Sequence, residues 1–426
     1  MQLTSPEPWE SFLTQIDYSR RRYALGLFFI LCQCVVWITA AVITQFVYDE
    51  NADTSPFLMT YIGMSMMALF LPFELWNDRR ARKSEEASKN SNGDGDEQNA
   101  DYFRTIDRYD SFDHELMAAE SPYCLFNIMC NRTWELADQK QNTKPWNHKK
   151  HMLAALQIAP AMFFADWAFN NALRHTSVAS CTVIVSSQNV VVFLLAVLAK
   201  LETFSWIKLA GVLISMVGIA LTAMHDTSEE NDTADESNAF AIYGDLFAVA
   251  AALAYGLYTV QVRLFCPQNE DLYKMQLLMG YIGLFVLIPC FPYAAYKMFI
   301  VRHDLSLPIW ACILAKSLLD FVLTDYFLFR SVVLTSATVA TVGLGLTIPM
   351  AFVADLIFSP DYVISINSVV GALSVGAGFI SVTLAGDDEV KRDEKEEKIL
   401  EQSSGNDDAP VISRVVVLPL PGWAKP

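Results

Sequence analysis

The sequence predicts an all-α polytopic membrane protein with ten transmembrane helices, arranged as two inverted five-helix repeats. Two observations lead to this prediction: the chain has ten long apolar stretches, and short motifs of the first five recur in the second five. A helix that crosses a hydrocarbon core about 30 Å thick needs about 20 mainly apolar residues. Of the 426 residues, 53% are hydrophobic and only 18% are charged.

Each predicted span is long enough to cross a bilayer. The spans are Ala24–Tyr48, Pro56–Trp76, Met152–Leu173, Val178–Ala199, Trp206–Ala223, Tyr243–Phe265, Leu277–Tyr296, Leu307–Phe329, Ala337–Phe358 and Val363–Leu384. The first span is too long for the apolar core of a cleaved signal peptide, and no charged start precedes it in MQLTSPEPWESF. We therefore expect it to be retained.

Basic residues next to the spans predict the orientation. If the spans alternate, most flanking Lys and Arg fall on one side, including Arg20 to Arg22, Arg79 to Lys83, Lys149 and Lys150. Such an excess marks the cytoplasmic face, so both termini are expected in the cytosol. The net charge of -17 comes from loops and tail, and an acidic chain is unsuited to nucleic acid.

The polar segments divide the chain into regions. We predict a cytosolic N-terminus at 1–23, helices 1–2 at 24–76, a disordered cytosolic loop at 77–150, helices 3–5 at 151–224, an acidic luminal loop at 225–239, the second repeat at 240–386 and a cytosolic tail at 387–426. The long loop is predicted to be disordered because its middle is low in complexity. Asn231 in the luminal loop begins a sequon, Asn-Asp-Thr, and is a candidate glycosylation site.

The internal repeat is visible in matching motifs. Tyr61-Ile62-Gly63 recurs as Tyr281-Ile282-Gly283, and Leu71-Pro72-Phe73 recurs as Phe291-Pro292-Tyr293 at the same separation. Further matches are Asp166-Trp167 with Asp325-Tyr326, Thr176-Ser177 with Thr335-Ser336, and Thr182-Val183 with Thr341-Val342. Their separation is shorter because only the first half carries the long loop. A repeat of five spans enters the bilayer inverted, and such repeats place a substrate site near the midplane.

Two aspartates are the main candidate site residues. Asp166 and Asp325 each lie ten residues before the Thr that ends the helix, Thr176 or Thr335, which is roughly 15 Å along a helix and about half the hydrocarbon thickness. Trp167 and Tyr326 follow them, and carboxylates with aromatic neighbours suit a cation. Two alternatives are that the carboxylates carry a proton or that they only bond neighbouring helices.

Other polar residues lie within the spans. Lys316 and Asp320 are four residues apart, so they can pair with each other, or Lys316 can meet an anionic substrate. Asn170, Gln188 and Thr347 are candidates to line a cavity.

Two further features of the sequence concern the shape and packing of the helices. Pro349 frees a backbone carbonyl and predicts a helix break. Small-residue faces at Gly211 with Ser215 and at Ala372 with Gly376 indicate close helix packing, within the chain or in a homodimer.

Catalytic and metal signatures are missing from the predicted spans. A GxGD motif, typical of intramembrane aspartyl proteases, occurs only at Gly93-Asp94-Gly95-Asp96 in the long loop. The spans contain no phosphate loop, HExxH or GxSxG motif, and the cysteines have no metal-ligand spacing. We therefore predict neither an enzyme nor a cofactor. A membrane receptor or scaffold without transport remains the alternative of another class.

Several stretches resemble the F branch of solute carrier family 35, in the EamA-like drug/metabolite transporter superfamily. They are ALGLFFILCQCVVWITAAVITQ, APAMFFADWAFNNALRHTSVAS, GDLFAVAAALAYGLYTV and, across spans 8 and 9, LTDYFLFRSVVLTSATVATVGLGLTIPMAFVAD. Asp325, Tyr326, Thr347 and Pro349 fall on motifs of this branch, whereas Asp166 stands where it usually carries an amide. The resemblance implies ten helices in two inverted repeats with cytosolic termini.

The resemblance also implies a function. It indicates transport of a small metabolite in an endomembrane, the Golgi or the vacuole or lysosome, and members of the branch are linked to thiamine. Our hypothesis is a secondary transporter that works by alternating access on a cationic solute. A nucleotide-sugar antiporter is the alternative, which would need basic groups in the cavity. The expected partners are a small-molecule substrate and the lipid bilayer.

Overall fold

Every regular element in the described part of the chain is a helix. A computed structural model describes residues 21–40, 43, 55–91, 146–175, 178–226, 238–266, 272–300, 307–350 and 366–404. The labelled helices are α2 (Pro56–Met66), η1 (Met67–Leu69), α3 (Phe70–Ser91), α6 (His148–His175), α7 (Val178–Ser186), α8 (Gln188–Leu198), α9 (Trp206–Asp226), α10 (Asn238–Phe265), α11 (Met275–Ile300), α12 (Leu307–Ser317), the π-helical η6 (Leu318–Thr324), α13 (Asp325–Leu334), α14 (Ala337–Leu344) and α16 (Ile366–Ser404).

Eight described helices are long and apolar enough to cross a membrane. They are Arg21–Ala40, Pro56–Asn77, His148–His175, Ser180–Leu198, Trp206–Ala223, Ile242–Phe265, Met275–Phe299 and Ile366–Asp387. The predicted eighth span is a helix interrupted by the π-helical turn η6, and the ninth is described as a shorter apolar helix, Ala337–Met350. The chain is therefore a multi-pass, all-helical membrane protein.

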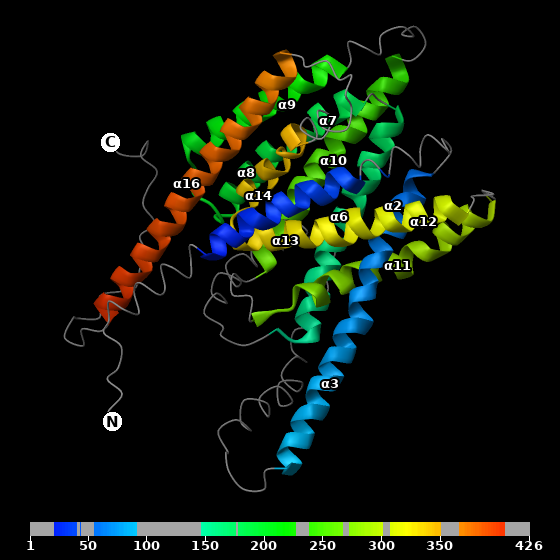
Figure 1. Cartoon of the computed structure of the whole chain (residues 1–426), viewed down its shortest axis with the longest axis vertical. Coiled ribbons are helices and arrows are strands. Elements are labelled where there is room, and N and C mark those ends of the chain that lie inside the picture. Colours follow the sequence, from blue (N-terminus) through cyan, green and yellow to red (C-terminus); the bar gives the residue numbers. More distant parts are fainter. Residues whose placement is uncertain are drawn as a thin grey trace, which may run out of the picture.

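The two halves of the chain are interleaved. In Figure 1, α9 of the first half lies along α16 of the second, and α6 packs along α10. Helices α2 and α11 pack together, as do α8 and α14. Because each of these pairs joins the first half to the second, the interior of the bundle is built by both halves.

The helix Arg21–Ala40 packs on α13. The ring centroids of Phe29 and Phe327 are 5.6 Å apart, and the guanidinium of Arg330 lies 5.8 Å from the centre of the Phe29 ring. A Cβ at Gly26 would lie 2.6 Å from a methyl carbon of Thr335, so this glycine allows the two helices to approach closely. The first helix of the chain is thereby held by the second half.

Small residues let α9 and α16 come together. A Cβ added at Gly211 would lie 2.9 Å from the carbonyl oxygen of Gly378, and one at Gly378 would lie 2.8 Å from the backbone nitrogen of Ser215. The predicted small-residue face of Gly211 and Ser215 therefore packs within the chain. On α16, Gly371 and Gly378 make the contact with α9, whereas the predicted Gly376 faces open space.

Two membrane helices are interrupted at matching places. Ser187 separates α7 from α8, and its amide bonds the Ile184 carbonyl three residues back at 3.0 Å. After α14, Leu346 similarly bonds Gly343 at 3.0 Å. In the second case the carbonyl of Gly345, which Pro349 leaves without its usual partner, accepts from Ile348 at 3.1 Å. The break thus lies one turn before the proline.

Two helices extend beyond the predicted membrane boundaries. α3 continues to Ser91, into the loop predicted to be disordered, and α16 continues to Ser404 in the predicted tail. Both extensions are rich in Lys, Glu and Arg, which are good helix formers. The rest of the long loop at 92–145, the glycosylation candidate Asn231 and the segment 351–365 lie outside the described residues.

Candidate functional site

Asp166 on α6 is bound by a tyrosine from the other half of the chain. The Tyr255 hydroxyl on α10 donates a hydrogen bond of 2.6 Å to Asp166 Oδ1. A short hydrogen bond to a carboxyl oxygen is among the stronger ones in proteins. The bond joins α6 to α10 and fixes the direction in which this acid points.

The other predicted acid belongs to the same cluster. Asp325 interacts electrostatically with Asp166 and with Asp320. Tyr258, one turn after Tyr255, is 3% exposed and also interacts with all three acids. We call Asp166, Asp320, Asp325, Tyr255 and Tyr258, with Lys316, the acid cluster. It gathers carboxyl groups from both halves in the interior of the bundle.

Lys316 is the basic member of the acid cluster. Its Nζ lies 3.5 Å from Asp320 Oδ2, and the side chains are 6% and 25% exposed. The same Nζ lies 5.4 Å from the centre of the Phe321 ring and interacts electrostatically with Asp166. Of the two sequence-based alternatives for Lys316, the structure contains the intrahelical pair. The acid cluster therefore holds three carboxyl groups and one ammonium, so carboxyl groups are in excess.

Trp167 and Tyr326, which follow the two predicted acids in the sequence, make their contacts with other residues. Trp167 packs edge-on against Phe247 at a centroid distance of 5.6 Å, inside an apolar cluster of α6, α7 and α10. The Tyr326 hydroxyl accepts a hydrogen bond of 3.3 Å from Gln276 Nε2 on α11. The rings that accompany the acids are instead those of Tyr255, Tyr258 and Phe321.

The remaining predicted polar residues have local partners or lie apart. Asn170 is buried and donates to Thr60 Oγ1 at 3.0 Å, which ties α6 to α2. Thr347 donates to the Leu344 carbonyl of its own helix at 2.8 Å. Gln188 is half-buried at the first position of α8, beside the helix break.

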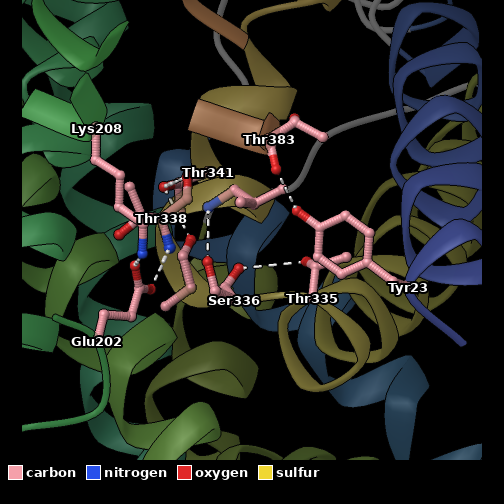
Figure 2. A network of polar contacts seen from close by, with 10 residues as sticks. Tyr23, Glu202, Lys208, Thr335, Ser336, Thr338, Thr341 and Thr383 are labelled. Carbon is pink, nitrogen blue, oxygen red and sulfur yellow. Dashed lines mark hydrogen bonds and ion pairs between the residues drawn. The ribbon is translucent and has the colours of Figure 1, made fainter. Parts of the chain in front are cut away.

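A second polar network lies at the start of α14. Lys208 Nζ donates to Glu202 Oε2 at 3.0 Å, and the two side chains are 1% and 2% exposed. Glu202 Oε1 accepts the Thr338 amide at 3.0 Å, and the Ser336 hydroxyl accepts the Val339 amide. Figure 2 shows these groups together with Tyr23, whose hydroxyl donates to the Thr383 carbonyl at 2.9 Å. A carboxylate at a helix N-terminus is favourable, so this network anchors α14.

The sequence analysis missed several of these residues. Tyr255 and Tyr258 are three apart in AYGLYTV and share one helix face, which was a usable signal. Phe321 had no signal, because its role depends on the π-helical turn. Glu202 and Lys208 flank the start of a span, but their link to α14 is visible only in three dimensions. Among the described residues, no group of three His, Cys, Asp or Glu side chains is arranged to hold a metal ion.

The known proteins that this chain is similar to include transporters and membrane proteins. Residues 125–224 match the EamA-like transporter family. The thiamine-repressible mitochondrial transport protein THI74 of Saccharomyces cerevisiae is 27% identical over 87% of this chain and 94% of its own length. The vacuolar membrane protein YML018C of the same yeast is 24% identical over 84% of the chain and 90% of its own length. Solute carrier family 35 member F5 of Mus musculus is 24% identical over 86% of this chain and 78% of its own length.

A solved crystal structure has a similar fold. It superposes with a TM-score of 0.51 at 12% identity, over 86% of this chain and 98% of the other. At that identity the likeness concerns the fold alone.

Proposed function

We propose that this chain, which matches the EamA-like transporter family over residues 125–224 and is similar to the transport protein THI74, moves a small organic cation across a membrane by alternating access. Asp325 is the principal binding or coupling acid, and Asp166 is its counterpart in the other half. The observation that carries this proposal is the excess of carboxyl groups over basic groups in the acid cluster. Ionisable residues inside a membrane domain are costly and mark solute pathways.

The helix pairs support two inverted five-helix repeats. The motif matches pair span 2 with span 7, span 3 with span 8 and span 4 with span 9. The contacts α2–α11 and α8–α14 each join two such matching spans, as two related halves require. The contact of α6 with α10 also has a counterpart, the contact of α13 with the helix Arg21–Ala40. The interruptions at Ser187 and Leu346 fall at positions that the repeat relates. Interrupted helices at matching places in two halves are typical of a transporter's binding region.

The position of the first and last membrane helices supports cytosolic termini. Tyr23 near the start of the first helix bonds the Thr383 carbonyl near the end of the last apolar stretch. These two ends therefore lie on the same face of the bundle, as an even number of spans requires. The basic residues that flank the spans are the reason to propose that this face is the cytosolic one. We propose an endomembrane location, the Golgi or the vacuole or lysosome, which the vacuolar name of YML018C supports, whereas the name of THI74 is mitochondrial.

The acid cluster favours a cation over a nucleotide sugar. A nucleotide sugar carries phosphate groups, which need basic partners. Lys316 is the basic member of the acid cluster, and it already pairs with Asp320. A thiamine-like cation suits the carboxyl groups and the rings of Tyr255 and Tyr258. The name of the yeast relative THI74, which is thiamine-repressible, adds a reason to test thiamine first.

Uptake into vesicles tests the proposal. The purified protein is reconstituted, and the uptake of labelled thiamine and tetraethylammonium is compared with that of a nucleotide sugar. We expect saturable uptake of a cation and none of the nucleotide sugar. Nucleotide-sugar exchange in place of cation uptake would show that the antiporter alternative is correct. Binding of a solute without flux of any kind would instead favour a receptor.

A further inference from the structure

The ammonium of Lys316 already has the surroundings that an organic cation requires. It lies 3.5 Å from a carboxylate oxygen of Asp320 and 5.4 Å from the centre of the Phe321 ring. It also interacts electrostatically with Asp166 on α6, and its side chain is almost fully buried. A carboxylate and an aromatic face are the two groups that attract a desolvated cation most strongly.

The aromatic part of this environment is fixed by the neighbouring helix. A Cβ at Gly63 of α2 would overlap the Phe321 ring, so the ring packs directly on the α2 backbone. Phe321 itself is 5% exposed and lies in the π-helical turn η6. The surroundings of the ammonium are therefore fixed by packed side chains and backbone of four helices, α2, α6, α12 and η6.

The carboxylate of Asp320 needs a cation beside it. Its Oδ2 lies 3.5 Å from Lys316 Nζ where the lysine side chain is only 6% exposed, and a charge left without its partner inside a protein carries a large desolvation cost. When no substrate is bound, Lys316 offsets this charge. Its four-carbon stem is flexible, so the ammonium can leave the site while the backbone stays in place.

We propose that Lys316 is a tethered counter-ion: its ammonium occupies the cation site when the transporter is empty, and an incoming organic cation displaces it. This inference rests on the proposed function and adds a mode of transport. Because the carboxyl groups are never left without a cation, the empty transporter can reorient and return for another substrate. The protein then performs net uptake and does not depend on exchange of one substrate molecule for another.

Neutral variants of Lys316 separate the two modes of transport. We expect Lys316→Gln and Lys316→Met to lose net uptake of thiamine or tetraethylammonium into empty vesicles by at least about tenfold, because the empty form is trapped by its uncompensated charge. Exchange into vesicles preloaded with the same cation should stay within about threefold, with a lower half-saturation concentration, because the competing ammonium is gone. Lys316→Arg, which keeps the charge, should retain net uptake.

The matched control is Lys297→Gln on α11. Lys297 also lies over an aromatic ring, 5.7 Å from the centre of Tyr293, but it is not part of the acid cluster. We expect this variant to change neither flux. Wild-type protein that moves no cation would disprove the proposed function and this inference with it.

If the wild type does move a cation, Lys316→Gln and Lys316→Met test whether Lys316 is the tethered counter-ion. Equal loss of net uptake and exchange, no loss of either, or a raised half-saturation concentration would overturn the tethered counter-ion alone. If neither neutral variant can be purified in folded form, Lys316 is a structural residue and the inference is wrong.

Discussion

Two lysines pair with a carboxylate inside this bundle, and their surroundings differ. Lys208 and Glu202 are 3.0 Å apart, almost fully buried, and the second oxygen of Glu202 accepts the Thr338 amide. Lys316 and Asp320 are 3.5 Å apart, Asp320 is a quarter exposed, and two further acids interact with the pair. In the first pair, each charge has its partner, as expected of a structural contact. In the second, two further carboxyl groups share the site with one ammonium, which makes it the place for a cation. The charge balance, and not burial alone, distinguishes the two.

The largest expected effect is on the structural pair. Lys208→Met leaves the Glu202 carboxylate buried without its ammonium partner, which typically costs about 3–5 kcal/mol. We expect a large drop in the unfolding midpoint of the purified protein, measured by thermal unfolding in detergent. The double variant Lys208→Met with Glu202→Gln removes both charges and should recover much of the loss. A single variant as stable as the wild type would contradict the structural role of the pair.

The next effect is on transport. Asp325→Asn keeps the shape of the side chain but removes its charge, and loss of one partner from a buried charged contact costs about 2–5 kcal/mol. We expect cation uptake to fall by about 100-fold or more, with the unfolding midpoint nearly unchanged. Asp245→Asn is the matched control, because this half-buried aspartate on α10 accepts a hydrogen bond from Ser180 and lies outside the acid cluster. Near-normal uptake by Asp325→Asn would remove this residue from the mechanism.

A smaller effect is expected at the tyrosine that holds Asp166. Tyr255→Phe removes a hydrogen bond of 2.6 Å to a carboxyl group, a contact worth about 1.5–3 kcal/mol when the group is charged. The half-saturation concentration for the cation should rise about tenfold or more. Tyr61→Phe, which removes a hydrogen bond of 3.3 Å to the Leu287 carbonyl, should leave transport unchanged. If both variants behave alike, Tyr255 does not position Asp166 for binding.

The smallest effect is expected at a third lysine–carboxylate pair. Lys274 and Glu74 are 3.5 Å apart; the lysine side chain is 49% exposed and the glutamate side chain 11%. Because the ammonium is solvated, the pair should behave more like a surface pair, which contributes less than about 1 kcal/mol and is screened by salt. Glu74→Gln should therefore shift the unfolding midpoint only slightly, and less at high salt. A shift as large as that of Lys208→Met would show that exposure does not separate these pairs.

The site was partly readable from the sequence. The repeat related Asp166 to Asp325, and the structure brings the two acids within electrostatic reach of each other. The aromatic partners were not readable: Trp167 and Tyr326 turn to other contacts, and Tyr255 takes the place next to Asp166. The reason is helix rotation. A span that is apolar on all sides has no hydrophobic face from which its inner side can be predicted.

The sequence by itself determined that this chain is helical and crosses a membrane several times, because backbone groups in lipid must be satisfied within a helix and apolar length shows where. It also determined which acids lie inside the spans. Only the tertiary structure decided which of these charges are compensated. Glu202 meets Lys208 and the start of α14, while Lys316 pairs with Asp320 and lies within electrostatic reach of Asp166. Charge compensation depends on which helices are neighbours and how each is rotated, and close packing of side chains between helices sets both.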